Sequence, residues 1–564
     1  MDMSNIYRYL GAAERFRSTA YAKAAQSIDG LKEDVTTYLS QQTTEDIPGI
    51  GESIAEKIGE YVKTGKIRKY EELKRKVPLE LLELMNVSGF GPQTLKQIHR
   101  ELKISTKEAL IKAIEDGRIS RLKGFGPKKV ENMKRGLKLQ KQASERMPLW
   151  KAMQIGERIV NQLRVLEEIR EIELAGSIRR GKETIGDIDI LIACDPAHRR
   201  KVIEFFTRVP DVKVVLAKGE TKASILIKER NVQVDLRVIN DQEWGAALLY
   251  FTGSKEHNIY LRTLAREKGL KISEYGVFDA SSQKRLAGKN EKEIYDLFGL
   301  QFIPPELREM RDEFELAAKR KIPRLIELED IKGDMQMHST WSDGSMDIEP
   351  LARFVMKNYP YEFIVLTDHS KSSRIAHGMD EREFLKEIRE IERINKKLGK
   401  NYILKGVEVD ILADGSLDLK DDLLRKMDWV CASIHSGFTK DNTERLVKAC
   451  QHPLVHCIGH PTGRLIGKRE PYKADWEEVF KAAAKAGTAM EINAQPDRMD
   501  LKDELARQAV EAGVKLTIST DSHTAAQFAF MKLGVLVARR AGCKKGNVLN
   551  TRGLKDIIAA KKKR

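Results

Sequence analysis

One short segment, GDIDILIA at 186–193, constrains the fold of this chain more than any other. It is an apolar run interrupted by Asp187 and Asp189, whose spacing of two places both carboxylates on one face of a β-strand. A second apolar stretch, VQVDLRVI at 232–239, carries Asp235. Carboxylates in apolar strands are costly unless they are neutralised. We therefore expect the three to converge and to bind two Mg²⁺ ions, which support in-line displacement at phosphorus.

A Gly-x-Gly element recurs three times in the first 150 residues, in IPGIGESIAEKI, VSGFGPQTLKQI and LKGFGPKKVENM. A pattern typical of an amphipathic helix follows each copy. Glycine allows backbone angles that other residues resist, and the amide groups of a helix N-terminus can bind a phosphate without reading bases. The glycines predicted to contact DNA in this way are Gly49, Gly51, Gly89, Gly91, Gly124 and Gly126.

Charge and composition limit the classes of protein that this chain can be. The net charge of +16 favours polyanionic partners, and residues 101–150 hold 13 Lys/Arg against 6 Asp/Glu. No run of 18 apolar residues is present, so we expect no membrane partner. The five cysteines are scattered without a CxxC pair, and no long apolar stretch opens the sequence. These features favour the reducing cytoplasm, and the length of 564 residues favours several domains. We expect the protein to be a monomer.

Two strings near the acidic strands carry a family resemblance. Gly176-Ser177 precedes Arg179-Arg180 and Asp187, and YFTGSKEHNIYLR at 250–262 follows Asp235. Together with the Gly-x-Gly elements, which resemble helix-hairpin-helix motifs, they resemble the X-family DNA polymerases over about residues 5–316. The resemblance implies repair synthesis from dNTPs on gapped or nicked duplex DNA. The residues it implies to bind the nucleotide or its template are Gly176, Ser177, Arg180, Gly186, Tyr250, Phe251, Gly253, Asn258 and Arg262.

Other members of the nucleotidyltransferase superfamily are an alternative to a DNA polymerase. Enzymes that extend tRNA or poly(A), and those that modify small molecules, share the GS…DxD signature but lack YFTGS and the helix-hairpin-helix repeats. From the residues themselves, Ser254 is expected to cap a helix that places Asn258 and Arg262 on one face. The strings therefore favour templated DNA synthesis.

A lysine in the first Gly-x-Gly copy has a separate interpretation. Lys57 follows Gly51 by six residues, at the place where the lyase domain of DNA polymerase beta and its relatives carries a Schiff-base lysine. The segment FRSTAYAKAA at 16–25 also resembles the first helices of that domain, and Tyr21 matches a tyrosine of the family. The resemblance implies attack of the Lys57 amine on an abasic sugar aldehyde. The family's phosphate-binding partners differ here, because Phe16 and Ser53 replace a histidine and a lysine.

Eight of the eleven histidines follow residue 330, where apolar stretches end in metal-competent side chains. Seven such stretches alternate with helical segments, at 333–339, 363–370, 402–410, 429–436, 456–461, 489–494 and 515–523. Ligands at the C-terminal ends of successive strands are typical of a β/α barrel. The pattern resembles the PHP (polymerase and histidinol phosphatase) domain, which implies a (βα)7 barrel with up to three metal ions, here Mn²⁺ or Zn²⁺.

The resemblance assigns the metal ligands of this barrel. They are His338, Asp343, His369, Glu408, His435, His460, Asp521 and His523, with Gln336 at the remaining position. Gln336 departs from the pattern, because the family usually has His-x-His where this chain has Gln336-Met337-His338. A neutral glutamine oxygen is a poorer ligand than imidazole for these ions, so one metal position is in doubt. The implied activities are 3′–5′ exonuclease and processing of 3′ ends and abasic sites.

The sequence thus predicts a multidomain α+β and α/β protein that fills short gaps in base excision repair. The expected parts are a lyase-like domain with helix-hairpin-helix (1–88), a helical DNA-binding domain (89–148), a nucleotidyltransferase palm with a mixed sheet (149–243), a thumb-like segment (244–316), a linker (317–332) and the PHP barrel (333–564). Two alternatives stay open. Either the barrel is the only enzyme and the polymerase head targets it to DNA, or the polymerase works and the barrel is an inactive platform.

Overall fold

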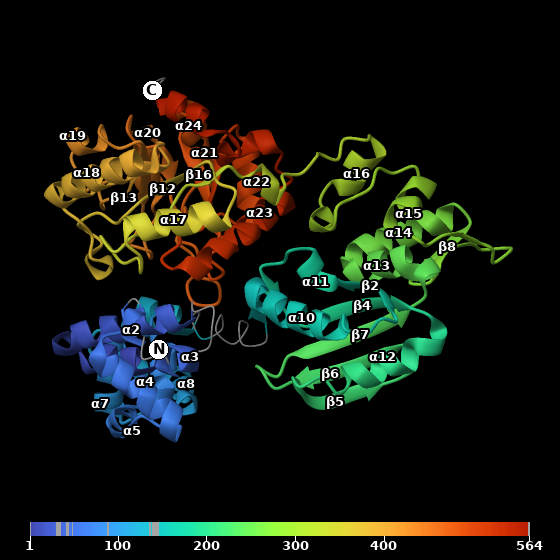
Figure 1. Cartoon of the computed structure of the whole chain (residues 1–564), viewed down its shortest axis with the longest axis horizontal. Helices are drawn as coiled ribbons and strands as arrows, with labels where there is room; N and C mark the ends of the chain where they lie inside the picture. Colours follow the sequence, from blue (N-terminus) through green and yellow to red (C-terminus); the bar gives the residue numbers. More distant parts are fainter. Residues whose placement is uncertain are drawn as a thin grey trace.

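The computed structural model describes residues 2–29, 35–40, 44–47, 49–86, 89–134, 137 and 146–561. Figure 1 shows a cluster of short helices near the N-terminus, a sheet-based region from the middle of the chain and a C-terminal barrel ringed by helices. This arrangement confirms the multidomain α+β and α/β class expected from the sequence. Across the described ranges, the structure has no helix of the length and apolarity that a bilayer span requires.

Short helices form the N-terminal region around one larger apolar core and a second, smaller cluster that contains Ile50. They are α1 (Asp2–Leu10), α2 (Arg15–Asp29), α3 (Val35–Ser40), α4 (Glu52–Thr64), α5 (Arg68–Lys74), α6 (Leu79–Leu82), α7 (Pro92–Leu102) and α8 (Lys107–Glu115), followed by a helix over 127–134. Leu81, Phe90 and Leu110 are fully buried in the larger core.

Each Gly-x-Gly element forms the predicted turn ahead of a helix. The first glycine of every copy has a positive φ, a conformation that side chains resist: 81° at Gly49, 92° at Gly89 and 83° at Gly124. The residue between the two glycines is an apolar anchor, and the three anchors are the buried Ile50, Phe90 and Phe125. Val87 and Ser88, at the start of the second copy and at the expected 88/89 boundary, lie outside the described residues.

A mixed five-stranded sheet in the order β2-β4-β7-β6-β5 forms the palm. Its elements are α10 (Leu149–Leu163), β2 (Ile169–Leu174), α11 (Gly176–Arg179), β4 (Ile188–Cys194), α12 (Arg199–Phe206), β5 (Val212–Lys218), β6 (Lys222–Ile227) and β7 (Gln233–Ile239). Strand β4 runs parallel to β7 and antiparallel to β2. Ile190 and Ile192 of β4 pack in the main core, whereas Leu191 packs in a separate cluster with Leu248. The period of two therefore assigns the acidic residues to the Leu191 face.

The thumb-like segment follows the palm with its own core, which contains Leu261, Tyr295 and Ile303. Its elements are α13 (Trp244–Thr252), α14 (Lys255–Glu267), β8 (Leu270–Ser273), β9 (Gly276–Asp279), β10 (Arg285–Ala287), α15 (Glu291–Leu297) and α16 (Glu313–Ala318). The stretch expected as a linker is not free of contacts: Ile326 and Ile331 are buried in the main core. The barrel is therefore docked onto the preceding parts rather than tethered to them.

Seven parallel strands in sequential order form the barrel, and each of the seven predicted stretches contains one of them. The strands are β11 (Gly333–Asp334), β12 (Phe363–Leu366), β13 (Ile403–Asp410), β14 (Trp429–Ser433), β15 (Cys457–Ile458), β16 (Ala489–Asn493) and β17 (Leu516–Ser519). The surrounding helices are α17 (Ile348–Asn358), α18 (Glu381–Leu398), α19 (Asp421–Leu424), α20 (Thr443–Gln451), α21 (Trp476–Ala486), α22 (Asp503–Glu511), α23 (Met531–Arg540) and α24 (Leu554–Lys561). A parallel bridge between Met337 and Ser522 joins the ends of the first and last strands, which nearly closes the barrel at its C-terminal edge.

Candidate active sites

The palm brings its three predicted carboxylates together. Asp189 on β4 lies directly opposite Asp235 on the parallel strand β7, and Asp187 immediately precedes β4. Burial, together with the charges of Asp187 and Asp235, raises the pKa of Asp189 to about 7. Mutual repulsion of this kind is relieved when cations bind between the carboxylates, so the site fits divalent ions. Gln233 also donates a hydrogen bond to Asp235, at 3.1 Å.

The GS turn is fitted closely against this acidic strand. The amide of Ala175 donates to the carbonyl of Asp189 at 2.9 Å, and α11 begins at the next residue. A Cβ atom on Gly176 would lie 2.2 Å from the Asp189 carboxylate, which explains the glycine. Ser177 is therefore the second residue of a short helical turn that begins beside the carboxylates. Gly186 lies just before Asp187, with the Arg146 guanidinium 3.1 Å from its Cβ position.

The YFTGS string forms a second wall of the same site. Arg180 Nη1 donates to the carbonyl of Thr252 and lies 3.1 Å from the Cβ position of Gly253. Ser254 caps α14 as predicted, accepting a hydrogen bond from the amide of His257 at 3.3 Å. Asn258 donates to the carbonyl of Tyr250 at 2.7 Å. The remaining predicted residues are adjacent, with Phe251 in contact with Tyr250 and Arg262 one turn beyond Asn258.

At the barrel mouth the eight predicted acidic and histidine ligands converge around Glu408. His460 Nε2 lies 2.8 Å and His435 Nε2 3.3 Å from Glu408 Oε1, and His369 Nδ1 lies 3.3 Å from Glu408 Oε2. His338 Nε2 lies 3.0 Å from Asp521 Oδ1 and 3.6 Å from Glu408 Oε2. Asp343 completes the set, with Oδ1 3.3 Å from His523 Nε2.

The donor set at this mouth fits metal ions. Three groups could each hold one ion: His338, Asp343, His369 and His523; His369, Glu408 and His435; and His338, Glu408 and Asp521. His369 Nδ1 and Glu408 Oε2 are close to each other, but neither of them, nor Nδ1 of His338, has a partner with the geometry of a hydrogen bond. Buried polar atoms without partners are costly, and coordination would satisfy them. Despite burial, Asp410 and Glu408 raise the pKa of His435 to about 10, whereas burial and Arg498 lower the pKa of His460 to about 4.

Gln336 lies inside this cluster but does not present an oxygen to it. Its amide nitrogen is 3.5 Å from Asp521 Oδ1, and its amide oxygen accepts a hydrogen bond from the Cys431 thiol at 3.1 Å. The side chain is 1% exposed. In this arrangement the Gln336 amide nitrogen is the hydrogen-bond donor, and it orients the Asp521 carboxylate.

The structure adds three residues to the mouth that the sequence interpretation missed. Asp410 accepts a hydrogen bond from His435 Nδ1, and Asn493 donates to Asp521 at 2.9 Å. Arg498 Nε lies 3.9 Å from Asp521 Oδ2, and its Nη1 is buried without a hydrogen-bond partner. Asp410 and Asn493 each lie two residues beyond an acidic residue of the same strand, so the period of two was a usable signal. Arg498 is on a loop and gave none.

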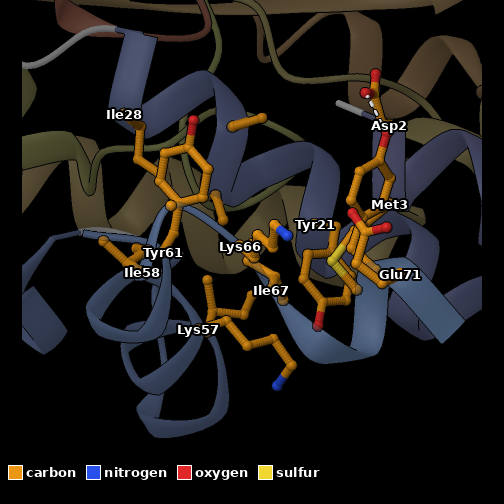
Figure 2. Close-up of a pocket in the computed structure, with 15 residues that line it drawn as sticks. Asp2, Met3, Tyr21, Ile28, Lys57, Ile58, Tyr61, Lys66, Ile67 and Glu71 are labelled. Atoms are coloured by element: carbon orange, nitrogen blue, oxygen red, sulfur yellow. Dashed lines mark hydrogen bonds between the residues drawn. The ribbon is translucent and has the colours of Figure 1, made fainter. Parts of the chain in front are cut away.

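Lys57 lines a pocket of about 450 Å³ in the N-terminal region. Figure 2 shows it near Tyr21, whose pKa is raised to about 12 by burial and by the neighbouring Tyr7. Lys57 Nζ donates to the carbonyl and the hydroxyl of Ser53, at 2.6 and 2.8 Å. Phe16 is 88% exposed.

Comparison with known proteins gives matches along most of the chain. The DNA polymerase beta palm family matches residues 146–232, and the DNA polymerase beta thumb family matches 247–309. A helix-hairpin-helix domain matches 3–67, and a SAM-like helix-hairpin-helix tandem matches 42–104 and 81–139.

Three relatives extend these matches. The DNA polymerase/3′-5′ exonuclease PolX of Bacillus subtilis is 38% identical over 98% of this chain and 96% of its own length. DNA polymerase lambda of Rattus norvegicus is 27% identical over 52% of this chain and 53% of its own. A probable phosphatase of Thermoanaerobacter sp. is 31% identical over 36% of this chain and 84% of its own.

Fold and site together define a nucleotidyltransferase palm joined to a barrel with a histidine-rich, metal-competent mouth. The chain belongs to family X of the DNA polymerases.

Proposed function

We propose that this protein is a DNA-directed DNA polymerase that adds dNTPs at gaps in duplex DNA, with a 3′–5′ exonuclease in its barrel. The observation that carries the polymerase half is the pairing of Asp189 with Asp235 beside Asp187. The exonuclease half is supported by the ligand cluster around Glu408 and by the similarity to PolX over 98% of the chain. Both halves depend on divalent metal ions.

Roles for the palm residues follow from their positions. Asp187 and Asp189 would hold two Mg²⁺ ions, and Asp235 would lie nearest the primer hydroxyl. When bound, the ions would lower the pKa of that hydroxyl and neutralise the leaving pyrophosphate. Ser177, Arg180 and Gly253 surround the space for the triphosphate, while Tyr250, Asn258 and Arg262 would contact the sugar, base and template. The six Gly-x-Gly residues would bind the DNA backbone through open amide ends.

Primer extension tests this proposal directly. Purified protein is incubated with a 5′-labelled primer on gapped DNA, with or without dNTPs, in Mg²⁺ or Mn²⁺. We expect extension with dNTPs and shortening from the 3′ end without them. If the protein does not extend the primer, the polymerase half of the proposal is wrong. If it does not shorten the primer, the exonuclease half is wrong.

We further propose that the barrel uses Mn²⁺ or Zn²⁺ and that Gln336 weakens one of three metal positions. The amide nitrogen beside Asp521 supports this, because a donor cannot coordinate a cation. Replacing Gln336 with His should increase the metal bound per chain, measured by elemental analysis after gel filtration. Equal metal content in the wild type and Gln336→His would contradict the weakening.

A 5′ lyase activity is a second candidate, favoured by the place of Lys57 in the Tyr21 pocket. The amine would attack the aldehyde of an abasic sugar, and the resulting Schiff base can be trapped by borohydride. Lys57→Ala should abolish the trapped adduct, while Lys63→Ala on the same helix should leave it. An adduct that survives Lys57→Ala would exclude this role.

The division into domains and the cellular setting complete the proposal. We assign a lyase-like domain to 1–88, a DNA-binding domain to 89–148, a palm to 149–243, a thumb to 244–316, a linker to 317–332 and the PHP barrel to 333–564. Strand β1 (Met147–Pro148) pairs with β3 (Thr184–Ile185), which favours starting the palm two residues earlier. A cytoplasmic monomer remains the working expectation.

A further inference from the structure

Where the palm meets the barrel, one arginine of the barrel contacts the nucleotide-binding turn. Arg540, the last residue of α23, donates from Nη1 to the backbone carbonyl of Arg180 at 2.7 Å. The same nitrogen donates to Glu309 Oε1 at 3.0 Å. Glu309 Oε1 also accepts from Arg180 Nε at 3.1 Å. Arg540 thus contacts both Arg180 and the carboxylate that holds Arg180.

This contact belongs to a cluster of charged side chains with an excess of positive charge. Besides Glu309, Arg540 binds Asp503 at 2.8 Å, and Arg311 binds the same Asp503 oxygen at 2.8 Å. Arg540 is 5% and Arg180 14% exposed. Lys182 lies 3.6 Å from Glu309. Four cations therefore share the two carboxylates, with Glu504 3.7 Å from Arg311 at the exposed rim. Arg540 and Arg180 are the most buried of these cations, whereas Arg311 is 24% and Lys182 39% exposed. An incoming anion would bring negative charge to a cluster in which cations outnumber carboxylates.

Packing fixes the turn against the barrel helix. A Cβ atom on Gly181 would lie 3.4 Å from Leu536 Cβ and 3.5 Å from Arg540 Cδ. Nearby, the rings of Trp150 in α10 and Phe530 lie edge to face, with centroids 4.9 Å apart. The backbone that carries Arg180 is therefore seated on α23.

Arg180 lies between Glu309 and the space proposed for the triphosphate, so two anions would compete for its guanidinium. Its Nη1 lies beside Thr252 and Gly253, in the wall proposed to surround the triphosphate, while its Nε is held by Glu309. A triphosphate in that space would compete with Glu309 for the charge and orientation of the Arg180 guanidinium. Although burial opposes ionisation, Arg540, Lys182 and Arg180 lower the pKa of Glu309, so this carboxylate stays charged. Arg540 is the cation that can satisfy Glu309 when Arg180 turns to the nucleotide.

We propose that Arg540 of the barrel is a positioning residue of the polymerase site, which fixes the Arg180 turn and neutralises Glu309 so that Arg180 can bind the dNTP triphosphate. This inference rests on the proposed function, in which Arg180 contacts the triphosphate. Without Arg540, Glu309 has Arg180 as its main partner and holds it away from the nucleotide. Nucleotide binding is weakened, while the carboxylates that perform the chemistry are untouched.

Steady-state gap filling by full-length variants tests this. Arg540→Met should raise KM for dNTP about tenfold, with kcat and KM for gapped DNA within about twofold of wild type. The matched control is Arg539→Met, because Arg539 lies on the same helix but pairs with Glu306 and Glu327. It should leave KM for dNTP unchanged. The double variant Glu309→Gln/Arg540→Met should restore KM to within about threefold of wild type, because the competing charge is gone.

The outcomes separate the possible failures. Equal KM values for Arg540→Met and Arg539→Met, with wild-type synthesis intact, overturn this inference alone. No rescue by Glu309→Gln overturns the proposed neutralisation of Glu309 by Arg540, since the effect would then come from the turn alone. A wild-type protein that incorporates no dNTP overturns the proposed function together with it. Unfolding temperature and exonuclease rate are measured for every variant. If Arg540→Met does not fold, Arg540→Lys decides: we expect KM about threefold above wild type, and an unchanged KM contradicts the role.

Discussion

The palm and the barrel mouth gather acidic side chains in opposite ways. In the palm, three carboxylates come from two neighbouring strands, and Asp187 is exposed to solvent. At the barrel mouth, eight residues come from the ends of six strands, and the fully buried Glu408 is one of them. The palm set contains no histidine, whereas five of the eight barrel residues are histidines.

The pKa values show what this difference means. Burial and the charges of Asp187 and Asp235 raise the pKa of Asp189 to about 7, and the nearby Arg180 and Lys222 offset this rise only in part. Glu408 is more deeply buried, yet His369, His435 and His460 lower its pKa well below the usual value. The palm carboxylates therefore lack neutralising charge until metal ions bind, and a bound nucleotide could bring one of these ions. At the barrel mouth, the histidines already neutralise Glu408 before any ion binds.

The largest expected effect is the loss of DNA synthesis by a substitution in the palm. Asp189→Asn should lower dNTP incorporation about 1,000-fold, because one of the paired carboxylates that hold the ions is lost. Exonuclease activity on the same DNA should persist. Asp195→Asn, just beyond the end of the same strand, is the control and should retain both activities. If the first variant still extends primers at the wild-type rate, Asp189 does not belong to the polymerase site.

The reciprocal substitution, in the barrel mouth, should remove only the exonuclease activity. His435→Ala should lower 3′ degradation about 100-fold, since it removes a side chain that contacts both Glu408 and Asp410. Gap filling should continue. His452→Ala, a partly exposed histidine that lies outside the mouth, is the matched control. Undiminished degradation by His435→Ala would mean that the nuclease site lies elsewhere.

Metal removal should sharpen the contrast between the two sites. Chelation is expected to lower the unfolding temperature of the barrel by about 5–10 °C, because ions bound to a preassembled buried site stabilise the folded state. The palm transition should barely change. Differential scanning calorimetry with and without chelator, followed by return of Mn²⁺, measures both. Equal shifts in the two transitions would refute the idea that the barrel mouth alone is a preassembled metal site.

The smallest expected effect concerns the joint between the two regions. Despite burial, Arg540 and Arg311 lower the pKa of Asp503 to about 2 from an ordinary value of 3.8. Asp503 therefore contributes stability that is fully present above pH 3.8 and is lost as the pH falls toward 2. Asp503→Asn should lower the free energy of unfolding by about 2 kcal/mol at neutral pH. Urea titrations at pH 7 and pH 3 test this, with the exposed Glu504→Gln as control; a pH-independent difference would contradict it.

Much of the fold could be read from periodicity. The alternation around Asp187 and Asp189 located the acidic strand, the Gly-x-Gly spacing located three turns, and the polar ends of apolar stretches located all seven barrel strands. These signals are local, because a strand or turn is specified by residues within a few positions of one another. The contacts that involve Arg498 and Gln336 were not predictable, since both depend on loops and neighbouring strands distant in sequence.

By itself, the sequence determined the kinds of ligands and the strands that carry them, because side-chain chemistry and the period of two are properties of short segments. Only the tertiary structure decided how these pieces combine. It put Asp189 opposite Asp235, turned the amide nitrogen of Gln336 toward Asp521, and placed Arg540 against a turn 360 residues earlier in the chain. Such contacts depend on how separate cores dock, and docking is set by shape and charge over whole surfaces rather than by any short pattern.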